Sequence, residues 1–408
     1  MTESKQLVVL GGAGDMGRFA ARTAIDFDFI SEVIIADLDL TAAEKCAALL
    51  GKKARALQLD VTDAARLASV LEPADFVINC VGPFFRFAVP ILRAAIAAKT
   101  DYSDICDDPG PTKEMLALSG EAKAAGVCAL IGMGASPGLT NLLAAKAIGE
   151  LDETEEAYTG WDLEGATAKE DPNDIKGAGG DDPGPTAAYI HAAHIMCGKH
   201  QARRNGKDVM EKPLRKIKLD FPGIGRGRGW TIGHPEPLTL AHTHPHLKES
   251  ANIVLTSFRN MVMIKAMSAM ADAGVITIEQ MAKGLIGDTS EIPKAKETEL
   301  SGADAEEQNE NLAPGRLPQI FALAIGQRGG RPARVGTYIT SSPPGEMGGS
   351  TGVPCAIGLK IIANPAARKP GVYPPEGLLN PDAFFDALAP LCRPVREGHA
   401  DLVNVASS

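Results

Sequence analysis

The chain has 408 residues, of which 45% are hydrophobic and 23% charged, so it is expected to be a globular protein of more than one domain. Its net charge of −10 argues against nucleic acid or an anionic membrane as partners, because both require a basic surface. There is no leader pattern and no apolar run of about 18 residues, which argues against a membrane span. The seven cysteines are scattered without a Cys-x-x-Cys pair, so we expect reduced thiols and a cytoplasmic protein.

The first 130 or so residues alternate short apolar strands with helical segments. The predicted strands are 6–10, 32–37, 54–60, 75–80, 101–105 and 127–132, and the helices between them lie near 16–27, 41–50, 62–71, 87–99 and 112–125. Strands that are apolar almost throughout suit a parallel sheet buried on both faces. The pattern predicts a Rossmann doubly wound parallel sheet, with residues 1–135 as the NAD-binding domain.

A glycine-rich turn, Gly12–Gly17 (GAGDMG), follows the first strand and opens a helix. An acid, Asp37, ends the next strand, which is the spacing of a dinucleotide site. Gly12 is expected to make the tight turn, Gly14 to let the backbone approach the pyrophosphate, and Gly17 to let helix and strand pack closely. The predicted cofactor residues in this part are Gly12, Gly14, Asp15, Met16, Gly17 and Asp37.

The acid at the end of the second strand also bears on cofactor choice. The Asp37 carboxylate can accept both ribose hydroxyls, but it would repel a 2′-phosphate by about 4 kcal/mol at ~4 Å and an effective dielectric near 20. No arginine follows it in residues 38–41. The predicted cofactor is therefore NAD rather than NADP.

Two further loops are expected to contact the cofactor. Asp60 and Val61 end the third strand beside the adenine, although Asp60 could equally cap the next helix together with Thr62. The loop after the fourth strand is expected to cross over the cofactor, with Phe84 either near the nicotinamide or simply part of a turn. The predicted cofactor residues in these loops are Asp60, Val61, Cys80, Gly82, Pro83 and Phe84.

Residues 136–350 are predicted to form an α+β domain with a mainly antiparallel sheet that binds substrate. Helices are expected at 185–197 and 259–286, and strands at 215–220, 319–328 and 334–341. Asn205-Gly206 and Gly329-Gly330 are hairpin signals. The acidic stretch 288–316 is expected to be a surface loop or mobile lid.

Residues 351–408 are predicted to be mainly helical. One helix spans 351–362, and another begins at Pro381 with Asn380 as its N-cap.

The same glycines occur in short-chain dehydrogenases, whose chemistry needs a tyrosine followed four residues later by lysine. None of the five tyrosines has lysine at that position. The chain instead resembles the saccharopine dehydrogenase family of NAD(P)-dependent oxidoreductases. The resemblance rests on the segments Val77–Phe84, Asp101–Asp107, Gly132–Asn141, Gly233–Glu236, Thr351–Ile357 and Gly371–Glu376.

This resemblance implies chemistry at a carbon–nitrogen bond of an amino acid or polyamine. It also implies a homodimer, and C-terminal helices that fold back onto the Rossmann domain. The chain departs from the characterised members at Gly177–Gly180 and at His242–His246. These departures bear on the identity of the substrate.

Oxidation of an amine requires a neutral nitrogen, so a nearby carboxylate or histidine should remove a proton. Asp107 is predicted to be such a catalytic group, and its neighbours Asp104 and Asp108 to bind the substrate, because crowded acids raise one another's pKa. Asp108 could instead cap the following helix. His234 and Glu236, in a Gly-His-Pro-Glu turn, are also predicted to be catalytic, unless the turn is an ordinary surface turn.

A substrate carboxylate has two candidate sites. Pro137, Gly138 and Thr140 begin a helix whose N–H groups could bind it, although Thr140 and the following asparagine could equally be caps. Arg226 and Arg228 could bind it as bidentate partners, although a solvated hairpin is the alternative.

The histidines outside these sites are assigned no chemistry. His242–His246 is expected to be a solvated loop, and no metal site is predicted. Tyr189, His191 and His194 share one predicted helix and are expected to make packing or dimer contacts.

These observations predict an NAD-dependent oxidoreductase that transfers a hydride at an amine or imine carbon. Two alternatives remain open. One is an enoyl or carbonyl reductase, or a polyamine synthase, of the same fold. The other is a non-catalytic NAD-binding dimer.

Overall fold

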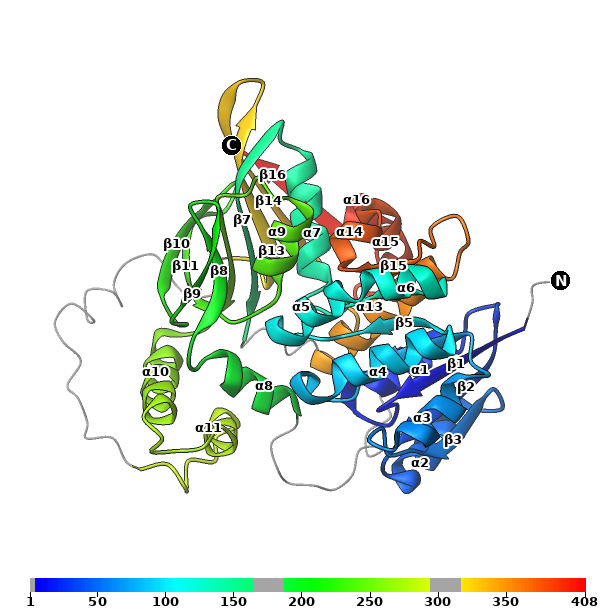
Figure 1. Ribbon diagram of the computed structural model, residues 1–408. Helices are drawn as coiled ribbons and strands as arrows, with labels where there is room; N and C mark the ends of the chain where they lie inside the picture. Colours follow the sequence, from blue (N-terminus) through cyan, green and yellow to red (C-terminus); the bar gives the residue numbers. More distant parts are fainter. Residues whose placement is uncertain (1–3, 164–186, 294–316) are drawn as a thin grey trace. The chain divides into compact units, whose positions relative to one another are not determined.

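The computed structural model describes residues 4–163, 187–293 and 317–408 (Figure 1). Two compact units make up the chain. One contains the residues up to Ala145 together with Ile339–Asn404, and the other contains most of Lys146–Tyr338 together with Val405–Ser408. Most of the predicted loop 288–316, and the segment Gly177–Gly180, lie outside the described residues. The three-part division at 135 and 350 stays a prediction.

The first unit holds a parallel sheet that has seven strands in the described part of the chain, in the order β15-β6-β5-β4-β1-β2-β3 (Figure 1). Its strands are β1 (Lys5–Leu10), β2 (Ile30–Asp37), β3 (Ala54–Gln58), β4 (Phe76–Asn79), β5 (Asp101–Asp104), β6 (Cys128–Leu130) and β15 (Gly371–Tyr373). The connecting helices are α1 (Asp15–Ala24), α2 (Leu40–Leu50), α3 (Ala64–Leu71), α4 (Phe84–Ala98), α5 (Pro109–Ala117) and α6 (Ser119–Ala125). The strand order reverses between β1 and β4, and ligands of doubly wound sheets bind at that point. The predicted Rossmann fold is confirmed.

The seventh strand, β15, was not predicted. It has three residues and pairs in parallel with β6, from Gly371 opposite Cys128 to Tyr373 opposite Leu130. Because so short a segment becomes a strand only by pairing with residues far away in the sequence, local pattern does not reveal it.

The C-terminal segment also contributes the helices α13 (Glu346–Ile362), α14 (Pro375–Leu378), α15 (Pro381–Leu388) and α16 (His399–Leu402) to the first unit. Helix α13 packs against α1 through glycines, because a Cβ at Gly348 would lie 2.7 Å from the Asp15 carbonyl oxygen and one at Gly352 2.2 Å from that of Met16. Asn380 caps α15 as predicted, since its Oδ1 accepts a hydrogen bond from the Ala383 N–H (3.0 Å). The predicted return of the C-terminal helices to the nucleotide domain is therefore confirmed.

The second unit is built on a mixed sheet that has nine strands in the part of the chain described (Figure 1). They are β7 (Glu153–Asp162), β8 (His200–Arg204), β9 (Lys207–Glu211), β10 (Lys216–Phe221), β11 (Gly225–Ile232), β12 (Glu249–Leu255), β13 (Ile320–Arg328), β14 (Arg331–Ile339) and β16 (Val403–Ser407). Strands β7 and β12 run parallel, whereas β10–β11, β11–β12, β7–β13 and β13–β14 are antiparallel pairs. The predicted mainly antiparallel sheet is confirmed.

Both predicted hairpins are present. Asn205 and Gly206 have φ of 49° and 72°, and Gly329 and Gly330 have 58° and 70°. Two successive positive φ angles suit the twist of a two-residue hairpin, which is why asparagine and glycine stand there.

The helices α8 (Ala187–Ile195), α9 (Glu236–Thr243), α10 (Phe258–Asp272) and α11 (Ile278–Leu285) belong to the second unit, whereas α7 (Leu139–Gly149) begins in the first unit and ends in the second. Residues 259–286 were predicted as one helix, but they form two. Gly274, with φ of 71°, follows the end of α10, and Thr277 begins α11 with a capping box to Gln280.

No helix in the described ranges is long and apolar enough to cross a membrane. All seven cysteines are free thiols.

Candidate active site

The glycine-rich turn joins β1 to α1. Gly11, with φ of 67°, makes the tight turn expected of Gly12, and the Gly14 N–H donates back to the Gly11 carbonyl (3.1 Å). Gly12 is needed for space instead, because a Cβ there would lie 2.8 Å from the Val9 carbonyl oxygen. The close packing expected of Gly17 is confirmed, since its Cβ would lie 2.1 Å from the Gly11 oxygen. The turn therefore presents bare backbone at the start of α1, as a pyrophosphate requires.

Asp37 ends β2 directly beside this turn. Its Oδ2 accepts a hydrogen bond from the Ala13 N–H (3.1 Å), and its Oδ1 accepts one from the Asp39 N–H (3.3 Å). Arg18 forms an ion pair with Asp15, the first residue of α1, which offsets the negative charge that Asp15 places at the helix N-terminus. The bare turn, the helix start and the carboxylate fit the pyrophosphate and ribose of a dinucleotide.

Asp60 forms an exposed turn of its own. Its Oδ1 accepts hydrogen bonds from the Thr62 hydroxyl (2.7 Å) and backbone N–H (2.9 Å), and these bonds lower the pKa of its carboxyl. The alternative that it caps the next helix is wrong, because α3 begins at Ala64 with Asp63 as its N-cap. Its contact with adenine, and that of Val61, stay predictions.

A buried hydrogen-bond network joins the three loops that follow β4, β5 and β6. Asn79 Nδ2 donates to the Tyr102 hydroxyl (3.0 Å), and this hydroxyl donates to Asp104 Oδ2 (2.8 Å). Asp104 Oδ1 accepts from the Cys106 N–H (3.0 Å) and from the Gly132 N–H (2.7 Å). Asp104 therefore positions backbone at the ligand edge of the sheet.

This arrangement corrects the prediction that Asp104 binds substrate. The residue is 0% exposed, and both of its oxygens accept hydrogen bonds from neighbouring loops. Burial raises the pKa of its carboxyl to about 6, although the hydrogen bonds from Gly132 and Cys106 act in the opposite direction.

This raised pKa predicts a pH-dependent effect of Asp104→Asn on stability. Because the folded pKa lies above the ordinary 3.8, the carboxyl stabilises the fold fully below pH 3.8 and loses that contribution as pH rises through about 6. The free energy of unfolding of the wild type relative to Asp104→Asn should fall by about 2 kcal/mol between pH 4 and 7. Urea unfolding across this range measures it, with the exposed Asp28→Asn as control. A difference that does not vary with pH would contradict it.

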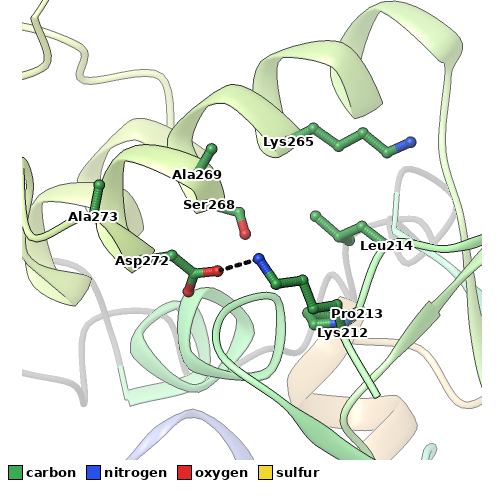
Figure 2. A pocket seen from close by; sticks show the side chains of 8 residues that line it. All are labelled: Lys212, Pro213, Leu214, Lys265, Ser268, Ala269, Asp272 and Ala273. Carbon is green, nitrogen blue, oxygen red and sulfur yellow. Dashed lines mark ion pairs between the residues drawn. The ribbon is translucent and has the colours of Figure 1, made fainter.

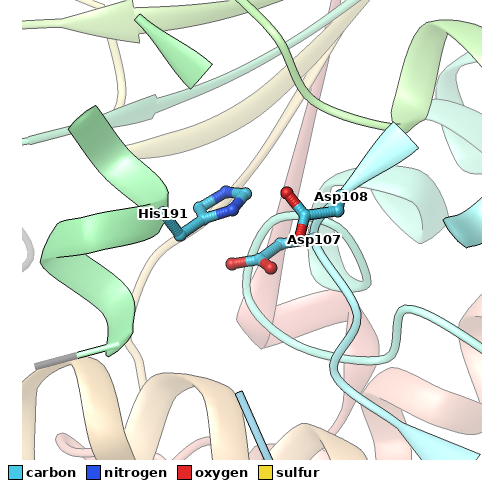
Figure 3. Close-up of side chains that lie close together, drawn as sticks. All are labelled: Asp107, Asp108 and His191. Carbon is cyan, nitrogen blue, oxygen red and sulfur yellow. The ribbon is translucent and has the colours of Figure 1, made fainter. Parts of the chain in front are cut away.

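Asp107 and Asp108 lie between β5 and α5 (Figure 3). Asp108 precedes α5 but makes no side-chain cap to it. Instead its Oδ2 accepts a hydrogen bond from the Phe85 N–H (3.0 Å) at the start of α4. The alternative that the Asp108 side chain caps the following helix is therefore wrong. Asp107 is half-buried, whereas Asp108 is buried.

The loop after β4 leads straight into α4. Phe84 is the first residue of this helix and is 8% exposed, with Pro83 as the N-cap residue. Helix α4 therefore begins three residues before the predicted 87. The Cys80 carbonyl oxygen would lie 3.0 Å from a Cβ on Gly11, so this loop runs against the glycine-rich turn. Gly82 and Pro83 lie in this loop, between Cys80 and the first residue of α4.

The loop after β6 ends in a capped helix. Asn141 Oδ1 accepts a hydrogen bond from the Gly138 N–H (2.9 Å), and its Nδ2 donates to Glu376 Oε2 (2.9 Å). A Cβ on Gly138, which has φ of 122°, would lie 2.1 Å from the Gly134 carbonyl oxygen. Asn141 is therefore a cap, as one alternative had it. Pro137 and Thr140 are buried on either side of Gly138.

In the second unit, the Gly-His-Pro-Glu turn is buried throughout, so the alternative of a surface turn is wrong. His234 is 3% exposed and Glu236, the first residue of α9, is 0% exposed. His234 Nδ1 lies 3.4 Å from Glu236 Oε2. Asn252 Nδ2 donates to the other oxygen of Glu236 (2.7 Å). The turn thus holds a buried imidazole–carboxylate pair.

The two arginines of β11 differ in environment. Arg226 is exposed, whereas Arg228 is 4% exposed and its guanidinium lies 5.7 Å from the ring centre of Phe258 and 6.0 Å from that of Trp230. The alternative of a solvated side chain is therefore confirmed for Arg226 and wrong for Arg228. A two-arginine clamp would need Arg228 to lose these aromatic contacts.

A pocket of about 460 Å³ lies beside α10 in the second unit (Figure 2). Lys212 faces Asp272 across it, with 3.9 Å between Nζ and Oδ2. None of the predicted site residues is among the eight described residues that line this pocket. We assign it no part in the chemistry.

Sequence analysis missed four residues of these networks. Asn79 and Asn252 stand in buried, mostly apolar strands, where a polar residue was the available signal, whereas Tyr102 stands in the polar strand β5. His191 was expected only to pack, but its Nε2 lies 3.4 Å from His234 Nε2. The two histidines are 43 residues apart in the sequence, so the sequence gives no hint of this contact.

Three comparisons bear on this chain. Residues 7–130 match the family model of the saccharopine dehydrogenase NADP binding domain. This part of the chain is therefore similar to the nucleotide-binding domain of saccharopine dehydrogenases. A saccharopine dehydrogenase-like oxidoreductase of Rattus norvegicus is 29% identical over 120 residues, which are 26% of this chain and 28% of that protein. The matched region thus covers less than a third of the length of that relative.

The fold similarity extends further than the sequence similarity. Apo saccharopine dehydrogenase (L-Glu forming) from Saccharomyces cerevisiae matches with a TM-score of 0.62 over 99% of this chain and 100% of its own, at 16% identity. At this identity the match shows that the two chains share a fold, over residues well outside 7–130 as well. The resemblance stated from the sequence is confirmed.

Proposed function

We propose that this protein is an NAD-dependent oxidoreductase that acts at a carbon–nitrogen bond of an amino acid or polyamine-like substrate. The observation that carries the nucleotide part is the bare turn at the start of α1 with the Asp37 carboxylate bonded to the Ala13 N–H. The carbon–nitrogen part is supported by the fold shared with a saccharopine dehydrogenase (L-Glu forming). When bound, the nicotinamide would supply the hydride chemistry, and the protein would orient substrate and handle protons.

The cofactor preference is proposed to be NAD, although the matching family is described by NADP. Asp37 stands where the adenosine ribose is expected, and the next residues, Leu38 and Asp39, bring no positive charge. The cation near the turn, Arg18, forms an ion pair with Asp15. A 2′-phosphate would therefore meet a carboxylate, and ~4 kcal/mol of repulsion corresponds to about a thousandfold in affinity.

Proton handling is assigned to three residues. Asp107 is half-buried after β5, at the ligand edge of the sheet. His234 and Glu236 form the buried pair of the second unit. A substrate carboxylate is proposed to bind at Pro137–Thr140. Asp104 and Asp108 are now assigned to positioning loops, since they accept backbone hydrogen bonds.

Turnover on a panel of ω-amino acids, polyamines and secondary amines, measured by the change in NADH absorbance, tests this function. We expect reduction of NAD with at least one amine. Reaction with enoyl or carbonyl compounds but no amine would overturn the carbon–nitrogen assignment. Tight NAD binding without turnover on any compound would overturn enzymatic function.

The family resemblance also leads us to propose a homodimer. Light scattering during gel filtration should give twice the 42.7 kDa chain mass. A monomeric mass at micromolar concentration would contradict it.

A further inference from the structure

Three titratable side chains of the second unit form a continuous line. Glu236 Oε2 lies 3.4 Å from His234 Nδ1, and His234 Nε2 lies 3.4 Å from His191 Nε2. Glu236 and His234 are buried, whereas His191 is half-buried. Figure 3 shows the His191 side chain on its helix, α8. The line therefore runs from a fully buried carboxylate to an imidazole that is partly open to solvent.

The inner end of this line is held by strands rather than loops. Asn252, on β12, donates one Nδ2 hydrogen to Glu236 Oε1 (2.7 Å) and the other to the Thr159 hydroxyl on β7 (2.9 Å). Asn252 and Thr159 are both 0% exposed, and they stand opposite each other in the register of β12 and β7. On one side of His234, the Trp161 ring lies with its centroid 5.9 Å from that of the imidazole. The carboxylate and the inner imidazole are thus fixed in place.

The charges restrict which protons this line can carry. A fully buried carboxylate is costly unless a positive charge or hydrogen bonds compensate it. With hydrogen on Nδ1, His234 carries an N–H on the side of this carboxylate, and it adds a positive charge when Nε2 is protonated too. The two Nε2 atoms lie 3.4 Å apart, so with hydrogen on one of them that imidazole donates, the other accepts, and a single proton lies between them.

We propose that Glu236, His234 and His191 form a proton relay whose outer member, His191, exchanges the proton with the amine substrate. The idea rests on the proposed function for the identity of the substrate. In the oxidative direction, neutral His191 takes a proton from the substrate ammonium and becomes an imidazolium. It then passes its Nε2 proton to Nε2 of His234. The positive charge moves to His234, next to the Glu236 carboxylate, and the substrate nitrogen is left neutral, as loss of a hydride requires.

In this relay Glu236 balances the positive charge that His234 gains, and Asn252 is a positioning residue. The negative charge of Glu236 Oε2, 3.4 Å from Nδ1, favours the tautomer of His234 with hydrogen on Nδ1, in which Nε2 is the acceptor toward His191. Asn252 fixes the carboxylate through Oε1 and leaves Oε2 toward the imidazole. His194, three residues along the same helix as His191, is exposed and provides a matched control.

The first test needs no substrate and uses the full chain labelled with ¹⁵N-histidine. A scalar coupling between His191 Nε2 and His234 Nε2, across the N–H···N bond, is expected in the wild type and in His194→Gln. It should be lost in His191→Gln. Absence of the coupling in the wild type would overturn the relay, as would stoichiometric binding of added Zn²⁺ that shifts both Nε2 resonances.

The second test measures turnover with the amine found active in the substrate panel. His191→Gln should lower kcat/KM about 100-fold and remove the limb of the pH profile that rises with pH, and added imidazole should partly restore the rate of His191→Ala. His194→Gln should leave both rate and profile unchanged. Equal rates and profiles for His191→Gln and the wild type would overturn the relay. A coupling that is present while every amine is inert would instead locate the failure in the proposed function.

Discussion

Asp37→Asn is expected to abolish most of the discrimination between NADH and NADPH. The asparagine keeps an oxygen for the Ala13 N–H, so the glycine-rich turn should stay in place. Loss of the charge removes charge-assisted bonds to the ribose hydroxyls and should weaken NADH about tenfold. It also removes the repulsion of a 2′-phosphate, so the ratio of the two dissociation constants should fall by up to about a thousandfold.

Fluorescence titration with NADH and NADPH measures both constants at one ionic strength. Asp39→Asn is the matched control. It removes a carboxylate two residues away but keeps a side chain able to cap α2, which Asp39 does through the Ala42 N–H. If Asp37→Asn and Asp39→Asn changed the ratio equally, the preference would come from general charge and not from the ribose contact.

Gly352→Ala is expected to destabilise the nucleotide domain by about 3 kcal/mol. Its Cβ would lie 2.2 Å from the Met16 carbonyl oxygen and 2.9 Å from the Ala20 nitrogen, and backbone atoms cannot rotate away as a side chain does. Helix α13 must therefore move off α1. Because Met16 lies in the first turn of α1, the same displacement should weaken NADH binding. Urea unfolding and NADH titration measure the two effects.

The matched control is the same substitution in a helix with free space. A Cβ on Gly120, in α6, would have no neighbouring atom within 4 Å, so Gly120→Ala should stabilise the protein by about 0.5–1 kcal/mol. The two substitutions are thus expected to act in opposite directions. A small or stabilising effect of Gly352→Ala would mean that α1 and α13 adjust easily, and that the C-terminal segment does not support the turn.

Both predictions concern the same feature, a nucleotide domain completed by the end of the chain. The turn itself is formed by residues close in sequence, but α1 packs against a helix more than 300 residues later. Strand β15 likewise adds to the sheet beside β6. Substitutions in the C-terminal segment should therefore affect nucleotide binding without contacting the nucleotide.

Much of the Rossmann unit could be predicted because its signals are local. Most of the parallel strands, such as β1 and β2, are largely apolar, and the residues between the strands have helical periodicity. The two hairpins followed from Asn205-Gly206 and Gly329-Gly330, since positive φ angles restrict the residues allowed. Strand β7 and helix α9 escaped prediction because polar residues such as Glu155 and His242 interrupt their patterns.

The roles of the acids depended on partners that local sequence does not reveal. Asp104 and Asp108 looked like substrate ligands when read with Asp107 alone. Their partners, the backbone N–H groups of Gly132 and Phe85, come from other loops of the sheet. The three crowded acids therefore indicated the edge of the sheet at which ligands bind, but the substrate-binding role predicted for Asp104 and Asp108 was wrong.

By itself the sequence determined the nucleotide turn, the acid beside it and the parallel sheet, because spacing along the chain sets each of them. Only the tertiary structure decided that Asp104 joins three loops and that His191 continues the line from Glu236 through His234. Those contacts join residues distant in the chain, and their geometry comes from the packing of strands and helices.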